Sequence, residues 1–75
     1  MLDTMDNIMM GERGIVIKIN GKDDIKHRLL DLGLSKGMEI DCVLVSPFGD
    51  PKAYWIKGAL IALRNDDAKN ILIKR

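Results

Sequence analysis

The sequence predicts a mainly β domain, in which a small curled sheet carries one short helix. Short apolar segments with alternating side chains recur along the chain, which is the pattern of half-buried strands. Glycine and proline residues separate these segments and mark tight turns between them. One segment, IKHRLLDL, has instead the period of an amphipathic helix.

The first strand is expected at Gly14–Ile19, after a loose lead-in over residues 1–7. Its three isoleucines alternate with Val16 and Lys18, so the isoleucines share one face of the strand. Asn20-Gly21 then forms a turn.

The helix is expected at about Asp23–Leu32. Its apolar residues Ile25, Leu29 and Leu32 fall at i, i+4 and i+7, so they share one helical face. A helix this short is unstable alone in water, so this face must pack against the sheet.

Acidic residues and a glycine mark the two ends of this helix. Asp23 or Asp24 is expected to cap its start, and Gly33 follows where a helix end often needs a positive φ. Leu30 and Leu34 lie off the buried face. Either the turn after the glycine covers them, or they belong to an exposed apolar patch that binds a partner.

The second strand is expected at Met38–Val45, after a reversal at Lys36-Gly37. Alternation puts its even-numbered residues, among them Cys42 and Leu44, on one face. The other face begins polar and ends apolar, which predicts that the far end of the strand is covered on both sides.

Short strands and turns make up the rest of the chain. The segment Ser46–Pro51, with the sequence SPFGDP, is expected to be a tight connection. Strands at Ala53–Lys57 and Ala59–Arg64 follow, with a glycine hinge between them. One helical turn at 65–68 precedes a fifth strand at Ile71–Ile73. This order favours an SH3-like, five-stranded, partly open barrel with one short α-helix after the first strand.

Composition limits the function of this chain of 75 residues, which we expect to form one domain. Its basic and acidic residues are interspersed and leave a net charge of +1, so we expect no nucleic-acid partner. A single cysteine excludes an internal disulfide and fits a reducing compartment. No apolar run approaches the ~20 residues of a membrane span, and the acidic N-terminus is unlike a signal peptide. We therefore expect a cytoplasmic protein.

Few residues offer catalytic or metal-binding chemistry. With one histidine and few hydroxyl groups, no nucleophile–base pair is defined, so we expect no enzymatic activity. Asp23 and Asp31 each lie four residues from His27 and are weak metal-ligand candidates. A tight site needs more ligands and a second shell, so we predict no metal site and no cofactor.

Several landmarks occur in order along most of the chain. They are G-x-x-G at Gly11–Gly14, R-L-L-D-L-G-L-x-x-G at Arg28–Gly37, P-x-G-D-P at Pro47–Pro51, Gly58, A-L-R at Ala62–Arg64 and a final strand at Ile71–Ile73. This ordered set resembles the FeoA family, ferrous iron transport protein A. The resemblance implies an SH3-like barrel and an accessory role in which the protein binds and regulates the membrane ferrous iron transporter FeoB, meeting the membrane only through that partner.

The expected docking surface combines exposed turns with neighbouring aromatic residues. Its residues are Leu34, Lys36, Pro47, Gly49, Asp50, Pro51, Tyr54, Trp55 and Arg64. Two other functions stay open: a freestanding metal-sensing module similar to the C-terminal domain of iron- and manganese-dependent repressors, and a chaperone that delivers iron itself. A small sheet with exposed edges also leaves a homodimer open.

Overall fold

The computed structural model describes the whole chain, residues 1–75. Six antiparallel strands form one sheet in the order β1-β6-β2-β3-β4-β5. The strands are β1 (Leu2–Thr4), β2 (Arg13–Ile19), β3 (Glu39–Val45), β4 (Lys52–Ile56), β5 (Ala59–Leu63) and β6 (Ile71–Lys74). The helices are the 3-10 helix η1 (Met5–Asn7), α1 (Asp23–Asp31) and α2 (Asn65–Ala68).

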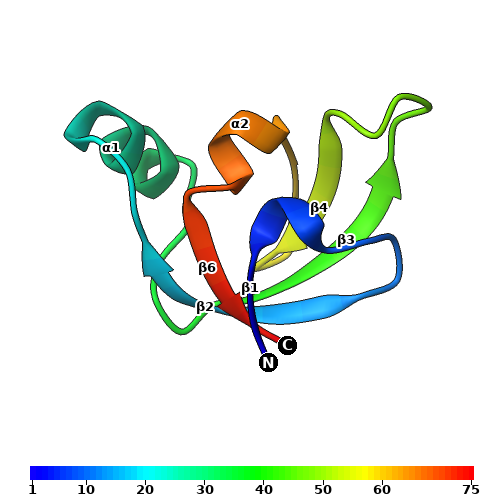
Figure 1. Cartoon of the computed structure of the whole chain (residues 1–75), viewed down its shortest axis with the longest axis horizontal. Helices are drawn as coiled ribbons and strands as arrows, with labels where there is room; N and C mark the ends of the chain where they lie inside the picture. The colour runs from blue at the N-terminus through cyan, green and yellow to red at the C-terminus, as the bar shows by residue number, and fades with distance from the viewer.

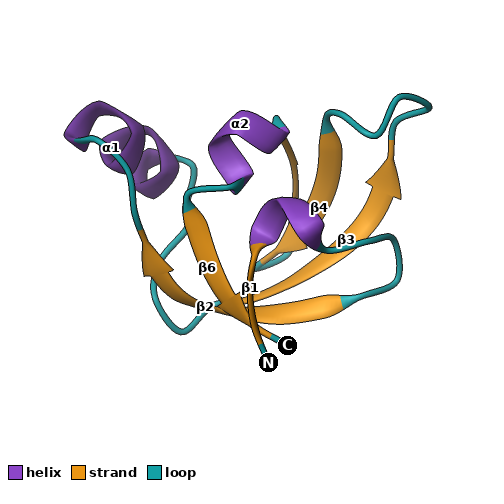
Figure 2. Ribbon diagram, in the orientation of Figure 1, coloured by secondary structure: helices purple, strands orange, loops and turns teal.

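The sheet curls into a trough, as Figures 1 and 2 show. Helices η1 and α2 lie together over its open side, and α1 lies beyond one end. The chain termini meet at the rim of the trough, where β1 pairs with β6. The predicted mainly β fold, with one helix after the first long strand, is therefore confirmed, although the sheet has six strands instead of five.

The additional strand comes from the segment that was expected to be a loose lead-in. Residues 2–4 pair with β6, and Met5 directly after them is fully buried. Arg75 fastens this pairing, because its guanidinium contacts Asp3 at 2.8 Å and Glu12 at 3.0 Å. The expectation was wrong because a three-residue strand is too short to show an alternating pattern.

The C-terminal end of α1 reverses one prediction about the core. The backbone N–H of Leu34 donates to the carbonyl of Leu29 at 3.1 Å, and that of Gly33 donates to Leu30 at 2.9 Å. With Gly33 at φ +101°, these bonds form a Schellman motif that folds the chain back under the helix. Leu34 is therefore buried beside Leu29, whereas Leu32, expected in the core, is 42% exposed.

The start of α1 also differs from the prediction. Lys22 is the N-cap residue, and its side chain makes no capping hydrogen bond. Asp23 and Asp24 lie within the first turn instead, where negative charge still favours the positive end of the helix dipole. Asp24 Oδ1 accepts a hydrogen bond from the backbone N–H of Ile25 at 2.9 Å.

An irregularity in β2 redistributes the isoleucines that were expected to share a face. The pairing with β6 shifts between Val16 and Lys18, so one extra residue, Ile17, lies between them. Val16 is fully buried, Ile15 on the preceding position is 43% exposed, and Ile19 packs against the core.

A second irregularity lies in β3, between Cys42 and Leu44. Beyond it, Leu44 faces outward and is 59% exposed, and Val45 takes the inward position against the core. Val43 is exposed as well. The prediction that the far end of this strand is covered on both sides was therefore wrong, because the bulge changes the face that each residue occupies.

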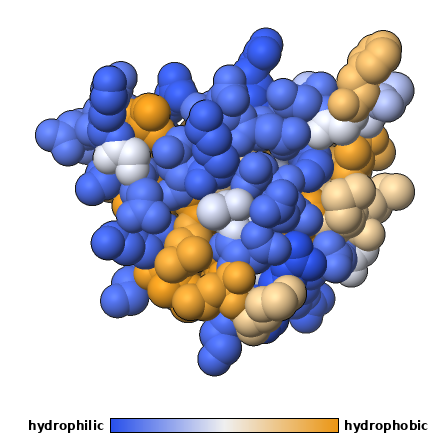
Figure 3. Space-filling view, in the orientation of Figure 1, coloured by the Kyte–Doolittle hydropathy of each residue, from blue (hydrophilic) through white to orange (hydrophobic).

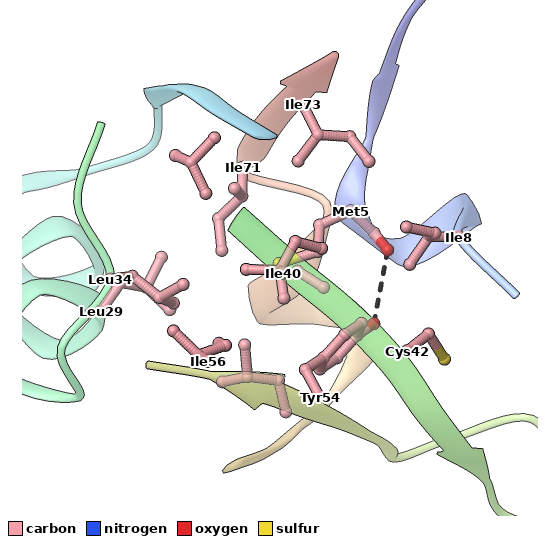
Figure 4. Packing of buried hydrophobic residues seen from close by; sticks show 13 residues of the cluster. Met5, Ile8, Leu29, Leu34, Ile40, Cys42, Tyr54, Ile56, Ile71 and Ile73 are labelled. Carbon is pink, nitrogen blue, oxygen red and sulfur yellow. Dashed lines mark hydrogen bonds between the residues drawn. The ribbon is translucent and has the colours of Figure 1, made fainter. Parts of the chain in front are cut away.

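The core is one cluster of 13 buried residues from β2–β6, the helices and the turns beside them (Figure 4). Tyr54 is its largest member, and its hydroxyl donates to the carbonyl of Met5 at 3.3 Å. Lys52 is nearly buried and donates to the carbonyl of Asp6. Both contacts join β4 to η1 across the trough. Figure 3 shows that the surface over the helices is mostly hydrophilic, with apolar patches at the rim near the termini and on one side.

Candidate docking surface

The predicted docking residues do not form one surface. Leu34 and Tyr54 are 1% and 0% exposed, so they are core residues and not contacts for a partner. Burial also raises the pKa of the Tyr54 hydroxyl. Lys36 precedes the start of β3, whereas the Pro47–Pro51 loop follows its end, and a strand of seven residues spans about 20 Å.

The Pro47–Pro51 loop is fastened to α2 near Arg64. Asp50 Oδ1 accepts a hydrogen bond from the backbone N–H of Asn65 at 2.9 Å, and Asn65 Nδ2 donates to the carbonyl of Gly49 at 3.1 Å. Arg64, the N-cap residue of α2, provides no side-chain cap. Asp50 therefore caps α2 from a distant loop, which gives it a structural role that the sequence prediction missed.

Lys36 and Trp55 are the predicted residues that the structure brings together. They line an open groove of about 570 Å³ between the α1–β3 turn and the β4–β5 turn, which we call the Trp55 groove. Its lining is Ser35, Lys36, Gly37, Met38, Glu39, Asp41, Trp55, Lys57 and Gly58. Trp55 lies on the outer face of β4, opposite Asp41 on β3, and is 47% exposed.

Ion pairs fix the acidic wall of the Trp55 groove. Arg13 on β2 donates from Nε to Asp41 Oδ1 at 2.6 Å, and its Nη1 lies 3.2 Å from Glu39 Oε1. The hydrogen bond to Asp41 and the two negative charges raise the pKa of the Arg13 guanidinium. Lys36 and Lys57 make no ion pair within the chain. The groove therefore presents two free ammonium groups beside an indole ring.

The turn between β4 and β5 sets the far rim of this groove. Both of its central residues have positive φ, +48° at Lys57 and +79° at Gly58, so the turn is type I′. The hinge at Gly58 was predicted. The position of Lys57 was missed, although a two-residue Lys-Gly link between apolar strands was a signal that could have found it.

No three histidine, cysteine, aspartate or glutamate side chains lie together in an arrangement that could hold a metal ion. The weak candidates Asp23, His27 and Asp31 are all exposed on α1. Cys42 lies in the core, and its burial raises the pKa of the thiol. None of the helices is long and apolar enough to cross a membrane.

The sequence model of the FeoA domain matches residues 4–75. The chain belongs to the FeoA family. This family is one of ferrous iron transport, and the match confirms the resemblance carried by the ordered sequence landmarks.

Solved structures of FeoA proteins share the fold. A FeoA-like protein from Clostridium acetobutylicum has a TM-score of 0.89 at 28% identity, over 95% of this chain and 83% of that protein. FeoA from Stenotrophomonas maltophilia, solved as a zinc complex, has a TM-score of 0.83 at 26% identity, over 96% of this chain and 89% of that protein. The latter is described as an SH3 domain protein, so the predicted SH3-like fold is confirmed.

Two longer proteins contain a region similar to this FeoA domain. A fusion of Fe(2+) transport protein A and the Fe(2+) transporter FeoB, from Porphyromonas gingivalis, is 26% identical over 70 residues. The match spans 93% of this chain but only 8% of the fusion protein. A manganese-dependent transcriptional repressor has a TM-score of 0.86 at 16% identity, over 96% of this chain and 40% of that one. The repressor likeness concerns the fold alone.

Proposed function

We propose that this FeoA domain is a non-catalytic cytoplasmic accessory protein that binds and regulates a FeoB-type ferrous iron transporter. The observation that carries this proposal is the Porphyromonas gingivalis relative, in which a FeoA region and FeoB are one polypeptide. In that organism the covalent link keeps the FeoA region beside the transporter. The domain reaches the membrane through the transporter, and it shifts the transporter's conformational or GTPase cycle by binding one state more tightly than another.

The Trp55 groove is the proposed docking surface. A half-exposed tryptophan offers a large, rigid contact area, and tryptophan is among the residues that most often dominate binding energy. Lys36 and Lys57 are free to pair with acidic side chains of the transporter. Because Arg13 already holds the two carboxylates of the groove, binding does not have to order these two side chains.

The test is an anaerobic binding assay against detergent-solubilised FeoB-type transporter from the same cell, with and without a GTP analogue and ferrous ion. We expect Trp55→Ala to weaken binding by at least about tenfold. The matched control is Phe48→Ala, because Phe48 is 96% exposed and lies in the loop beyond the opposite end of β3. Its affinity should be unchanged.

The possible results distinguish a wrong function from a wrong docking surface. Absence of binding by the folded wild-type protein under every condition would overturn the accessory role. If the wild-type protein binds and Phe48→Ala weakens that binding more than Trp55→Ala does, the accessory role stands and the Trp55 groove is rejected as the docking surface.

Metal sensing is the second candidate, favoured by the fold shared with the manganese-dependent repressor. A saturable one-to-one titration with ferrous or manganous ion would support a sensor. If the binding also disappears in His27→Ala, an iron-delivering chaperone becomes the better explanation. Neither result is expected, since no cluster of metal-binding side chains is formed.

A further inference from the structure

We propose that β5 is a homodimerisation edge, at which two copies of the chain pair their β5 strands antiparallel about a two-fold axis at Ile61. The sheet of one copy then continues into the sheet of the other. This inference is independent of the proposed function, because it rests on the edge of the sheet and not on the Trp55 groove.

β5 is an edge strand without the usual protection against pairing. It is the last strand in the order of the sheet, and the other edge, β1, has only three residues. Soluble proteins commonly protect edges with charged residues, proline or short strands. β5 has the sequence ALIAL, with no charge and no proline, and Leu60 in it is 60% exposed. Its backbone makes no hydrogen bond in the turns and loops, so β4 is its sole backbone partner.

The turn that precedes β5 determines which backbone groups face outward. In a two-residue type I′ hairpin, the residues that flank the turn, here Ile56 and Ala59, form a hydrogen-bonded pair. Pairs of this kind alternate along an antiparallel ladder, so Ile61 is bonded to β4 as well. Leu60 and Ala62 therefore direct their N–H and C=O groups away from β4.

These free groups match a second copy of the same strand. With the axis at Ile61, Leu60 of one copy lies opposite Ala62 of the other, and each donates its N–H to the carbonyl of its counterpart. The two-fold symmetry repeats both bonds. A large side chain then faces a small one at both symmetric positions, and no charge within the strand faces a like charge. This self-complementarity favours a second copy of the same chain as the partner of the β5 edge.

Sedimentation equilibrium of the purified full chain, from about 1 µM to about 1 mM, tests the proposal. We expect a reversible monomer–dimer equilibrium. Ala62→Pro removes an N–H that is used only in the dimer, and proline is tolerated where the N–H of an edge strand faces solvent. We expect it to lower the association constant by about tenfold or more while the monomer keeps its circular dichroism spectrum.

A second pair of variants keeps the test valid if the proline prevents folding. Leu60→Lys places a charge on the edge strand, at a residue that is 60% exposed, whereas Leu44→Lys places one at a residue that is 59% exposed on the interior strand β3. Leu60→Lys should weaken association, and Leu44→Lys should leave it unchanged. A wild-type protein that stays monomeric throughout, or a dimer that neither Ala62→Pro nor Leu60→Lys weakens, would overturn the proposal.

Discussion

Replacing Leu34 by alanine should destabilise the protein far more than replacing Leu32, although helical periodicity assigns these residues the opposite roles. Leu34 is 1% exposed and packs beside Leu29 beneath α1, as Figure 4 shows, whereas Leu32 is 42% exposed. Both positions lie past the last helical residue, Asp31, so helix propensity contributes little to the comparison. The difference in destabilisation between the two variants therefore reports the difference in burial between the two side chains.

The expected loss in free energy of unfolding follows from that burial. A buried leucine truncated to alanine loses about 2–5 kcal/mol, because the transfer free energy is lost and a cavity remains. For Leu32, nearly half exposed, the loss should be about 1 kcal/mol. A domain of 75 residues has a free energy of unfolding of roughly 4–11 kcal/mol, so Leu34→Ala removes a large part of it.

Urea unfolding followed by far-ultraviolet circular dichroism measures this difference. With a slope of about 1–1.5 kcal/mol per M for a chain of this size, the midpoint of Leu34→Ala should lie about 1 M or more below that of Leu32→Ala. Equal midpoints, or a lower midpoint for Leu32→Ala, would refute the assignment of the Schellman motif and the fold-back of the chain under α1.

Two further predictions concern polar contacts. Asp50→Ala should lower the free energy of unfolding by about 1 kcal/mol, because α2 loses its cap. The control is Asp66→Ala, which removes a solvent-exposed acid from the same helical turn and should change the free energy of unfolding by less than about 0.5 kcal/mol. Thermal melts that show equal losses of stability for the two variants would contradict this. Hydrogen bonds from Asn7 and the backbone N–H of Thr4 lower the pKa of Asp3 below 3.8, so its stabilising contribution is present above that pH and is lost as the pH falls through the lower, folded-state value. Asp3→Asn should therefore lower the Tm at about pH 7 and have little effect at about pH 2, and an equal effect at both would reject the role of the ionised carboxylate.

Local sequence patterns were enough to predict most elements of this fold. Alternating apolar residues located β2 to β6, and a period of 3.6 with a following glycine located α1. The patterns failed at the two bulges, because one inserted residue in a strand reverses the face of every residue after it while the sequence continues to alternate. Leu44 is exposed for this reason.

The candidate site was less accessible to sequence reasoning, because it depends on contacts between distant segments. Trp55 reaches the groove because the register of β4 places it opposite Asp41, and the local pattern of a single strand does not reveal how it is aligned with its neighbour. Asp50 caps a helix that begins 15 residues later, which no local capping pattern reveals. Lys36 was predicted correctly as exposed, since a turn before a strand is solvent-accessible in most folds.

The pairing of β1 with β6 has a consequence for how this unit is built into larger proteins. Met1 and Arg75 are hydrogen-bonded neighbours at 2.9 Å, so the polypeptide enters and leaves the domain at one point. A host chain interrupted between two adjacent residues could therefore accept the domain there without being stretched.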